Sequence, residues 1–172
     1  KAKSNDDIVG VTCMQLSLLL DRSIVAYTKS ENGMSTGRLF AEKKYTYSEN
    51  LLNDAEQKAA EWAFQNGRRT GATTAQFGKS ECLYLAIRAG DRVYGVIGIP
   101  MRPEKPDSCE NSIVLSVVNE CALDMANTHN AGEKERAAAL AKSEQMRADL
   151  LRSSPHGLRM LLCSLSGKAV TL

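Results

Sequence analysis

The first part of the chain alternates between helical and strand periodicity. After the cap residue Ser4, apolar side chains recur every three or four residues up to Leu20, which predicts an amphipathic helix that ends near Asp21. The β-branched run at residues 23–28 predicts a strand. Three further segments follow: a turn at residues 30–33, a weaker strand at residues 37–41 and a polar loop at residues 42–53.

Residues 54–65 return to helical spacing. Ala59, Trp62 and Ala63 share one face of this predicted helix, and Gly67 follows it as a C-terminal cap. We expect the single tryptophan in the core or in the wall of a pocket rather than in catalysis.

A polar loop is predicted at residues 68–74. Its two arginines, Arg68 and Arg69, lie close to Gly71 and would suit an anion. The alternative is an ordinary solvated loop, and the sequence favours that simpler interpretation.

The clearest strands are predicted at residues 81–88 and 92–99. A tight turn at residues 89–91 joins them into a hairpin. The second strand contains Gly95 and Gly98, which predict a bulge or the close approach of another element.

A long helix is predicted from about Cys109. Ile113, Val117, Cys121 and Met125 are spaced by four and form a wide apolar face. After Gly132, where the helix either bends or continues, residues 133–152 are rich in Ala, Glu, Lys, Arg and Gln and predict a largely solvated helical connector.

The last segment begins at Pro155, where we expect a kink or a new helix start. A leucine seam typical of a helix that packs against a partner helix follows at Leu158, Leu161, Leu165 and Leu172. On a helix, His156 would lie roughly 140–180° from these leucines and face solvent. A neutral imidazole there could accept a group from another domain, although an ordinary surface histidine shows the same pattern.

The order of elements predicts an α+β fold, with an antiparallel sheet whose helices pack on one face and a long helix at the C-terminal end. With 172 residues and a net charge of +2, the chain suits one or two small units and offers no basic patch for nucleic acid. No apolar run reaches the roughly 20 residues that a membrane-spanning helix needs, and no signal peptide is visible. We expect the chain, which begins at Lys1, to be an excised fragment.

The five cysteines are scattered and form no C-x-x-C pair. We interpret Cys13, Cys82, Cys109, Cys121 and Cys163 as reduced thiols, mostly in the core, and expect no metal site.

The segment around His156 resembles the H-box of sensor histidine kinases. Leu150-Leu151-Arg152-Ser153, then His156, Leu158, Arg159 and Leu162, follow the family pattern, and the version here is most similar to the potassium-responsive KdpD-type kinases. The resemblance implies that His156 is the phosphoacceptor. Gly157, Met160 and Leu161 depart from the pattern, which has an acidic residue, a threonine and a proline at these positions.

The same resemblance extends to a GAF domain, through residues 59–67, 70–74, 83–85 and 90–99. It implies a GAF-like sensor domain at residues 1–130, a helical connector at 131–154 and the start of the dimerisation and H-box helix at 155–172. It further implies a parent protein with transmembrane helices before Lys1 and an ATP-binding domain after Leu172, so that this part is the cytoplasmic portion of a bacterial plasma-membrane protein.

The partners implied by the resemblance are a second copy bound through the C-terminal helices, a cognate response regulator and the parent's own ATP-binding domain. ATP and Mg²⁺ would bind only that missing domain, and the fragment should be inactive as a kinase alone. GAF domains also bind small molecules, but no cofactor-binding residue can be assigned here; His129, the only histidine of the GAF part, falls toward the end of the long helix.

Three functions stay open from the sequence. The chain is the sensor and dimerisation segment of a histidine kinase, or a dimerising module whose H-box has decayed, or a small-molecule receptor domain whose connector helix holds subunits together.

Overall fold

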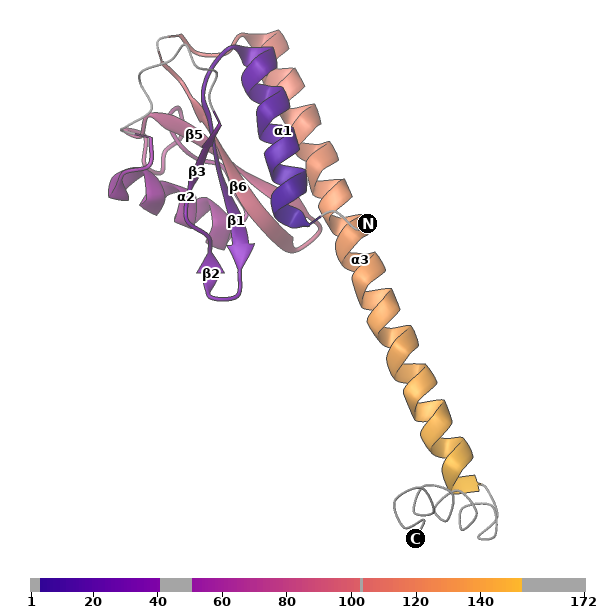
Figure 1. The fold of residues 1–172 in the computed structure, drawn as a ribbon. Coiled ribbons are helices and arrows are strands. Elements are labelled where there is room, and N and C mark those ends of the chain that lie inside the picture. The colour runs from indigo at the N-terminus through magenta and orange to yellow at the C-terminus, as the bar shows by residue number, and fades with distance from the viewer. Residues whose placement is uncertain (1–3, 41–50, 103, 153–172) are drawn as a thin grey trace, which may run out of the picture. The chain divides into compact units, whose positions relative to one another are not determined.

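The computed structural model describes residues 4–40, 51–102 and 104–152. The predicted phosphoacceptor His156, Pro155, the leucine seam and Cys163 lie outside these residues. The element order is α1 (Asn5–Leu20), β1 (Ile24–Ser30), β2 (Gly33–Met34), β3 (Arg38–Phe40), α2 (Asp54–Asn66), β4 (Thr70–Gly71), β5 (Cys82–Ala89), β6 (Arg92–Pro100) and α3 (Ser108–Arg152) (Figure 1).

The helices begin and end where the sequence provides caps. Ser4 and Asp7 form a capping box at the start of α1, and Asp21 ends that helix in a left-handed conformation. At α2, the Asn53 side chain accepts the N–H of Glu56, and Gly67 closes the helix at φ 64°. The predicted bounds of both helices are therefore confirmed to within a residue or two.

The strands form one antiparallel sheet in the order β2-β1-β6-β5-β4, with β3 paired to β1 as well. β5 and β6 make the predicted hairpin, with a register irregularity between Ile87 and Arg88. Gly95 lies against β1 at a point where a Cβ atom would meet the carbonyl oxygen of Tyr27, so the predicted close approach is confirmed.

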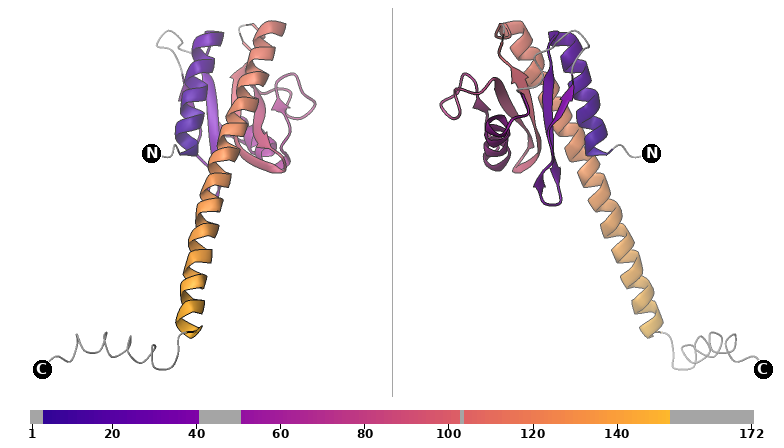
Figure 2. Two further views of the ribbon diagram at one scale, coloured as in Figure 1. Left: turned by 90° about the vertical axis from the view of Figure 1, so that its right-hand side faces the viewer. Right: turned by 60° about the vertical axis from the view of Figure 1, so that its left-hand side comes forward.

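Side chains alternate between two cores on opposite faces of the sheet. One core joins the sheet to α1 and the first part of α3, and contains Ile24, Leu85, Ile97 and Ile99. The other joins it to α2 and contains Tyr27, Cys82, Tyr84 and Val96. Figure 2 shows α1 and α3 on one side of the sheet and α2 on the other. The α+β class is confirmed, but the expectation of helices on a single face is wrong, because period-two alternation makes both faces of these strands apolar.

The second correction concerns residues 68–74, predicted as a loop. Thr70 and Gly71 instead form β4, a buried edge strand paired with Tyr84 and Leu83. Two residues are too short a run to show strand periodicity in the sequence.

α3 is a continuous helix that runs through Gly132 without interruption. The chain divides into two units, residues 1–128 and 129–172. In the first unit, α3 buries Val114, Val118, Cys121, Ala122 and Met125. None of the helical residues 129–152 is buried, as expected for a connector whose helicity comes from Ala, Glu, Lys, Arg and Gln. Among the described helices, none is long and apolar enough to cross a membrane.

Candidate functional site

A buried carboxylate holds α2 to the sheet. The Glu56 side chain is only 3% exposed, and its Oε1 atom accepts three hydrogen bonds. The donors are the backbone N–H groups of Glu81 (3.0 Å) and Cys82 (3.1 Å) and the hydroxyl of Tyr84 (3.1 Å). Burying a carboxylate is costly unless it is hydrogen-bonded, and these three donors meet that requirement.

The groups around Glu56 are strongly desolvated. Burial raises the pKa of Tyr27 to about 12, with the nearby Cys82 and Glu56 adding to the effect. Burial, with Glu56 adding to the effect, also raises the pKa of Tyr84 and of Cys82 well above their ordinary values. All three side chains therefore stay neutral at physiological pH, and none is an activated nucleophile.

This face of the sheet is filled by two tyrosine rings. Tyr27 and Tyr84 meet edge to face, with ring centroids 6.5 Å apart. A Cβ atom at Gly98 would lie 2.5 Å from the Tyr84 ring, and one at Gly37 would lie 2.7 Å from the Tyr27 ring. The described residues thus use the space below α2 for packing, although the Tyr27 hydroxyl has no hydrogen-bond partner among them.

The opposite face carries a groove of about 470 Å³ between α1 and the first part of α3. Ile8, Val11 and Val117 give it apolar walls, whereas Glu120 and Asp124 make one edge acidic. Two thiols, Cys13 and Cys121, are buried in this core, and Cys121 lines the groove. Burial raises the pKa of Cys13 to about 12 and also raises the pKa of Cys121, so neither thiol is reactive.

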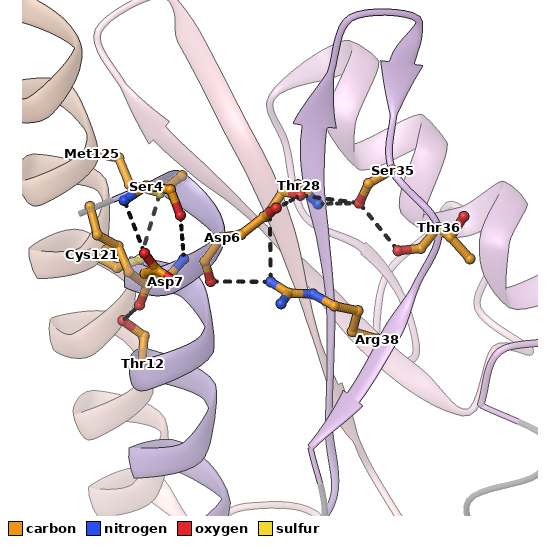
Figure 3. A network of polar contacts seen from close by, with 11 residues as sticks. Ser4, Asp6, Asp7, Thr12, Thr28, Ser35, Thr36, Arg38, Cys121 and Met125 are labelled. Carbon is orange, nitrogen blue, oxygen red and sulfur yellow. Dashed lines mark hydrogen bonds and ion pairs between the residues drawn. The ribbon is translucent and has the colours of Figure 1, made fainter. Parts of the chain in front are cut away.

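A polar network fixes the first turn of α1 to the sheet (Figure 3). Asp6 accepts a 2.7 Å hydrogen bond from the buried Thr28 hydroxyl on β1. Arg38 on β3 donates to the backbone oxygen of Asp6 at 3.2 Å and lies 3.7 Å from its carboxylate. Ser35 completes the network by accepting the backbone N–H of Thr28 at 2.9 Å. A displacement of the start of α1 would therefore act directly on β1 and β3.

A second, smaller cavity of about 220 Å³ lies on the same face as α1 and α3. Its lining includes Arg69, one of the two arginines predicted as anion ligands, and Lys105. The neighbouring Arg68 is exposed and does not line the cavity.

The structure also gives the positions of His129, Trp62 and the cysteines, which the sequence analysis named. His129 lies 3.1 Å from Glu133, one helical turn further along α3. Trp62 is half-buried and belongs to neither core cluster, so the expectation of a core position is wrong; Ala59, Ala60 and Ala63 form the buried face of α2 instead. Cys13, Cys82 and Cys121 are buried free thiols, as predicted, whereas Cys109 is exposed. The part of the chain that the structure describes contains no cluster of His, Cys, Asp or Glu suited to a metal ion.

Two functional candidates were missed from the sequence. Glu56 lies in a helix whose polar positions are mostly solvated. Only its position one helical turn before Ala59 and Ala60, on the same face, could have indicated burial. Asp6 lies in the first turn of α1, and nothing local to it in the sequence indicates its partner on β1.

Comparison with known proteins shows what this fold and this sequence resemble. The fold is similar to the GAF domain of the potassium sensor histidine kinase KdpD from Escherichia coli, with a TM-score of 0.54 and 17% identity over 80% of this chain and 88% of that one. A curated sensor protein KdpD from Clostridium acetobutylicum is 28% identical over 99% of this chain. The chain contains a KdpD-type GAF domain.

The KdpD match covers the chain almost completely but spans only 19% of the length of the Clostridium protein. The GAF3 domain of a Synechocystis protein, solved in its photoproduct state, shares the fold at a TM-score of 0.52 and 13% identity, over 76% of this chain and 98% of that one. No family model matches the chain.

Proposed function

We propose that the chain is the sensory and dimerisation segment of a KdpD-like sensor histidine kinase, with His156 at the phosphoacceptor position. The observation that carries the proposal is the alignment with a KdpD sensor protein over 99% of the chain, which is longer than the GAF domain alone. The continuous helix α3, which leads out of the GAF domain as far as Arg152, supports it as well. In this arrangement the chain is the cytoplasmic portion of a membrane kinase, and the phosphate passes on to a response regulator.

The contacts of α1 and α3 with the sheet support a role in which the GAF domain couples a movement of α1, the input helix, to α3, the output helix. The first turn of α1 is held to β1 and β3 through Asp6, Thr28 and Arg38. α3 packs its Val118 and Met125 side chains on the same face of the sheet. Because both helices share one core, a movement of α1 changes the packing of α3.

A second copy of the chain is the partner that the exposed apolar residues fit. Within residues 129–152, Leu140 is 62% exposed and Leu151 is 78% exposed. They lie eleven residues, about three helical turns, apart and therefore share a face. Leu158 and Leu165 follow at intervals of seven residues in the sequence, which is the spacing of a coiled-coil seam.

Phosphotransfer tests the proposal. The chain is incubated with ATP, Mg²⁺ and the ATP-binding domain of the same parent, and acid-labile phosphate is measured, with His156→Gln as the control. We expect label on the wild-type chain and none on the variant, because only the imidazole forms an acid-labile phosphoramidate at that position. Equal labelling of the two would contradict the assignment of His156.

The second candidate is a dimerising module whose H-box no longer accepts phosphate. Gly157, Met160 and Leu161 favour it, because the resembled family has an acidic residue, a threonine and a proline there. A folded dimer that takes up no label in the same assay would select this function over the first.

A further inference from the structure

We propose that the 220 Å³ cavity beside Arg69 and Lys105 binds a small organic anion with a hydrocarbon body, of the size of a medium-chain carboxylate. The inference concerns the GAF domain alone and does not depend on phosphotransfer. The sequence offered Arg68 and Arg69 as anion ligands, and of these two only Arg69 lines the cavity.

The base of the cavity is apolar. Leu83 and Leu85 on β5 and Ile99 on β6 point to this face of the sheet, and each is at most 9% exposed. Val114 on α3 and Met101 complete the apolar surface. An alkyl chain placed on these residues would leave water for an aliphatic surface, which is the main source of binding energy for such a ligand.

The polar side of the cavity is cationic. Arg69 and Lys105 both line it, and none of the described lining residues is acidic. Among the residues that the structure describes, neither side chain forms an ion pair with a carboxylate. A carboxylate group between them would gain charge-assisted hydrogen bonds, which are about twice as strong as neutral ones.

Both segments that carry the cations are held in place. Arg22 donates from its Nη1 atom to the backbone oxygens of Pro100 (2.7 Å) and Glu104 (2.8 Å), which fixes the segment that ends in Lys105. On the other side, Thr70 donates to the backbone oxygen of Gln76 at 3.0 Å, and Thr74 donates to it at 2.7 Å. These bonds close the loop after β4, so the walls of the cavity are formed before any ligand arrives.

Thr73, which also lines the cavity, has a left-handed backbone at φ 69°. A positive φ is a genuine outlier for a β-branched residue and strains the backbone. Such strain gathers at ligand-binding loops, which agrees with the position of Thr73 at the edge of the cavity.

The volume sets the size of the ligand. The cavity has a volume of about 220 Å³. This space suits a ligand of about ten non-hydrogen atoms, such as octanoate, and is below the 300–1,000 Å³ range of pockets for drug-sized molecules.

Binding of octanoate to the full chain tests the proposal, by titration calorimetry and by NMR shifts of the backbone amides. We expect a Kd below about 1 mM, with shifts at Thr73, Met101 and Asn111. Arg69→Gln and Lys105→Gln should each weaken binding about tenfold, because each removes one charged donor. Arg68→Gln is the matched control: it removes the same charge from the adjacent residue and should leave the Kd unchanged.

Three further measurements make the result decisive. Octan-1-ol, which lacks the charge, and inorganic phosphate, which lacks the apolar body, should both bind at least tenfold more weakly than octanoate. Leu115→Trp places a larger side chain at the exposed edge of the cavity and should block octanoate while circular dichroism shows an unchanged fold. Absence of binding at several millimolar octanoate, equal effects of Arg68→Gln and Arg69→Gln, or equal affinity for octan-1-ol would each overturn the proposal. None of these readouts involves His156, so failure here is distinguishable from failure of the kinase assignment.

Discussion

The two units of the chain are stabilised in different ways. Residues up to Thr128 bury two layers of apolar side chains, one on each face of the sheet. Residues 129–152 continue the helix α3 with no buried side chain at all, and Met146 is 60% exposed. A solvated helix of this kind is marginal in water by propensity alone. The comparison shows that the first unit is stabilised by internal packing, whereas the described part of the second unit has no buried side chain, which is why we propose a second copy of the chain as its partner.

The largest effect on the first unit is expected at Glu56. Glu56→Ala leaves the buried N–H of Cys82, the part-buried N–H of Glu81 and the Tyr84 hydroxyl without their acceptor, and we expect the free energy of unfolding to fall by about 3–5 kcal/mol. Urea denaturation measures this change. The matched control is Glu61→Ala on the exposed side of the same helix, with an expected change within about 0.5 kcal/mol. Equal losses from the two substitutions would show that Glu56 is not an anchor.

A pair of methionines on α3 compares the two units within one helix. Met125 is fully buried and Met146 is 60% exposed. Met125→Ala should destabilise the chain by about 2–4 kcal/mol, because it removes packing and leaves a cavity. Met146→Ala should change stability by less than about 0.5 kcal/mol. Thermal and urea unfolding of the two variants measure these changes. Similar losses of unfolding free energy in both variants would contradict the difference between the two units.

The buried thiols of the first unit should make its stability depend on pH above about 9. Burial raises the pKa of Cys13 to about 12 from an ordinary value of 9.0, and raises that of Cys82 as well. Above pH 9 the unfolded chain loses these protons while the folded chain keeps them. The folded state then binds more protons, and the free energy of unfolding falls as pH rises.

At pH 10 each of the two thiols should account for a loss of about 1 kcal/mol relative to pH 8. The measurement compares urea denaturation at the two pH values for the wild type, Cys13→Ala and Cys82→Ala. Each substitution should make the pH dependence shallower. Cys109→Ala, which changes an exposed thiol, should leave it as in the wild type; a change of similar size in this control would refute the role of burial.

The sequence predicted the elements with strong periodicity and missed those that depend on distant partners. The hairpin of β5 and β6 and the bounds of α1 and α2 were predictable, because spacing and caps are local. β4 was not, because Thr70 and Gly71 become a strand only by pairing with β5. Glu56 was missed for a similar reason: its donors lie at the start of β5, about 25 residues further along the chain.

The candidate sites, too, could be predicted from the sequence only as far as they depend on local residues. The sequence offered the arginine pair as anion ligands but favoured an ordinary solvated loop. The choice of Arg69 over Arg68 required the positions of Lys105 and of the apolar residues on β5 and β6. The assignment of His156 stays a prediction from the resemblance, since that residue lies outside the described part of the chain.

Sedimentation velocity of the chain tests the central claim most directly, since it asks whether the second unit is covered by a second copy. We compare the wild type with Leu140→Lys/Leu151→Lys and with the control Ala138→Lys/Gln145→Lys, which adds the same charge roughly 120–160° away on the helix. The account predicts a wild-type and a control species of twice the mass of one chain at micromolar concentration, and a monomer for the leucine variant. A wild-type monomer at high micromolar concentration, or a leucine variant that dimerises as well as the control, would contradict it.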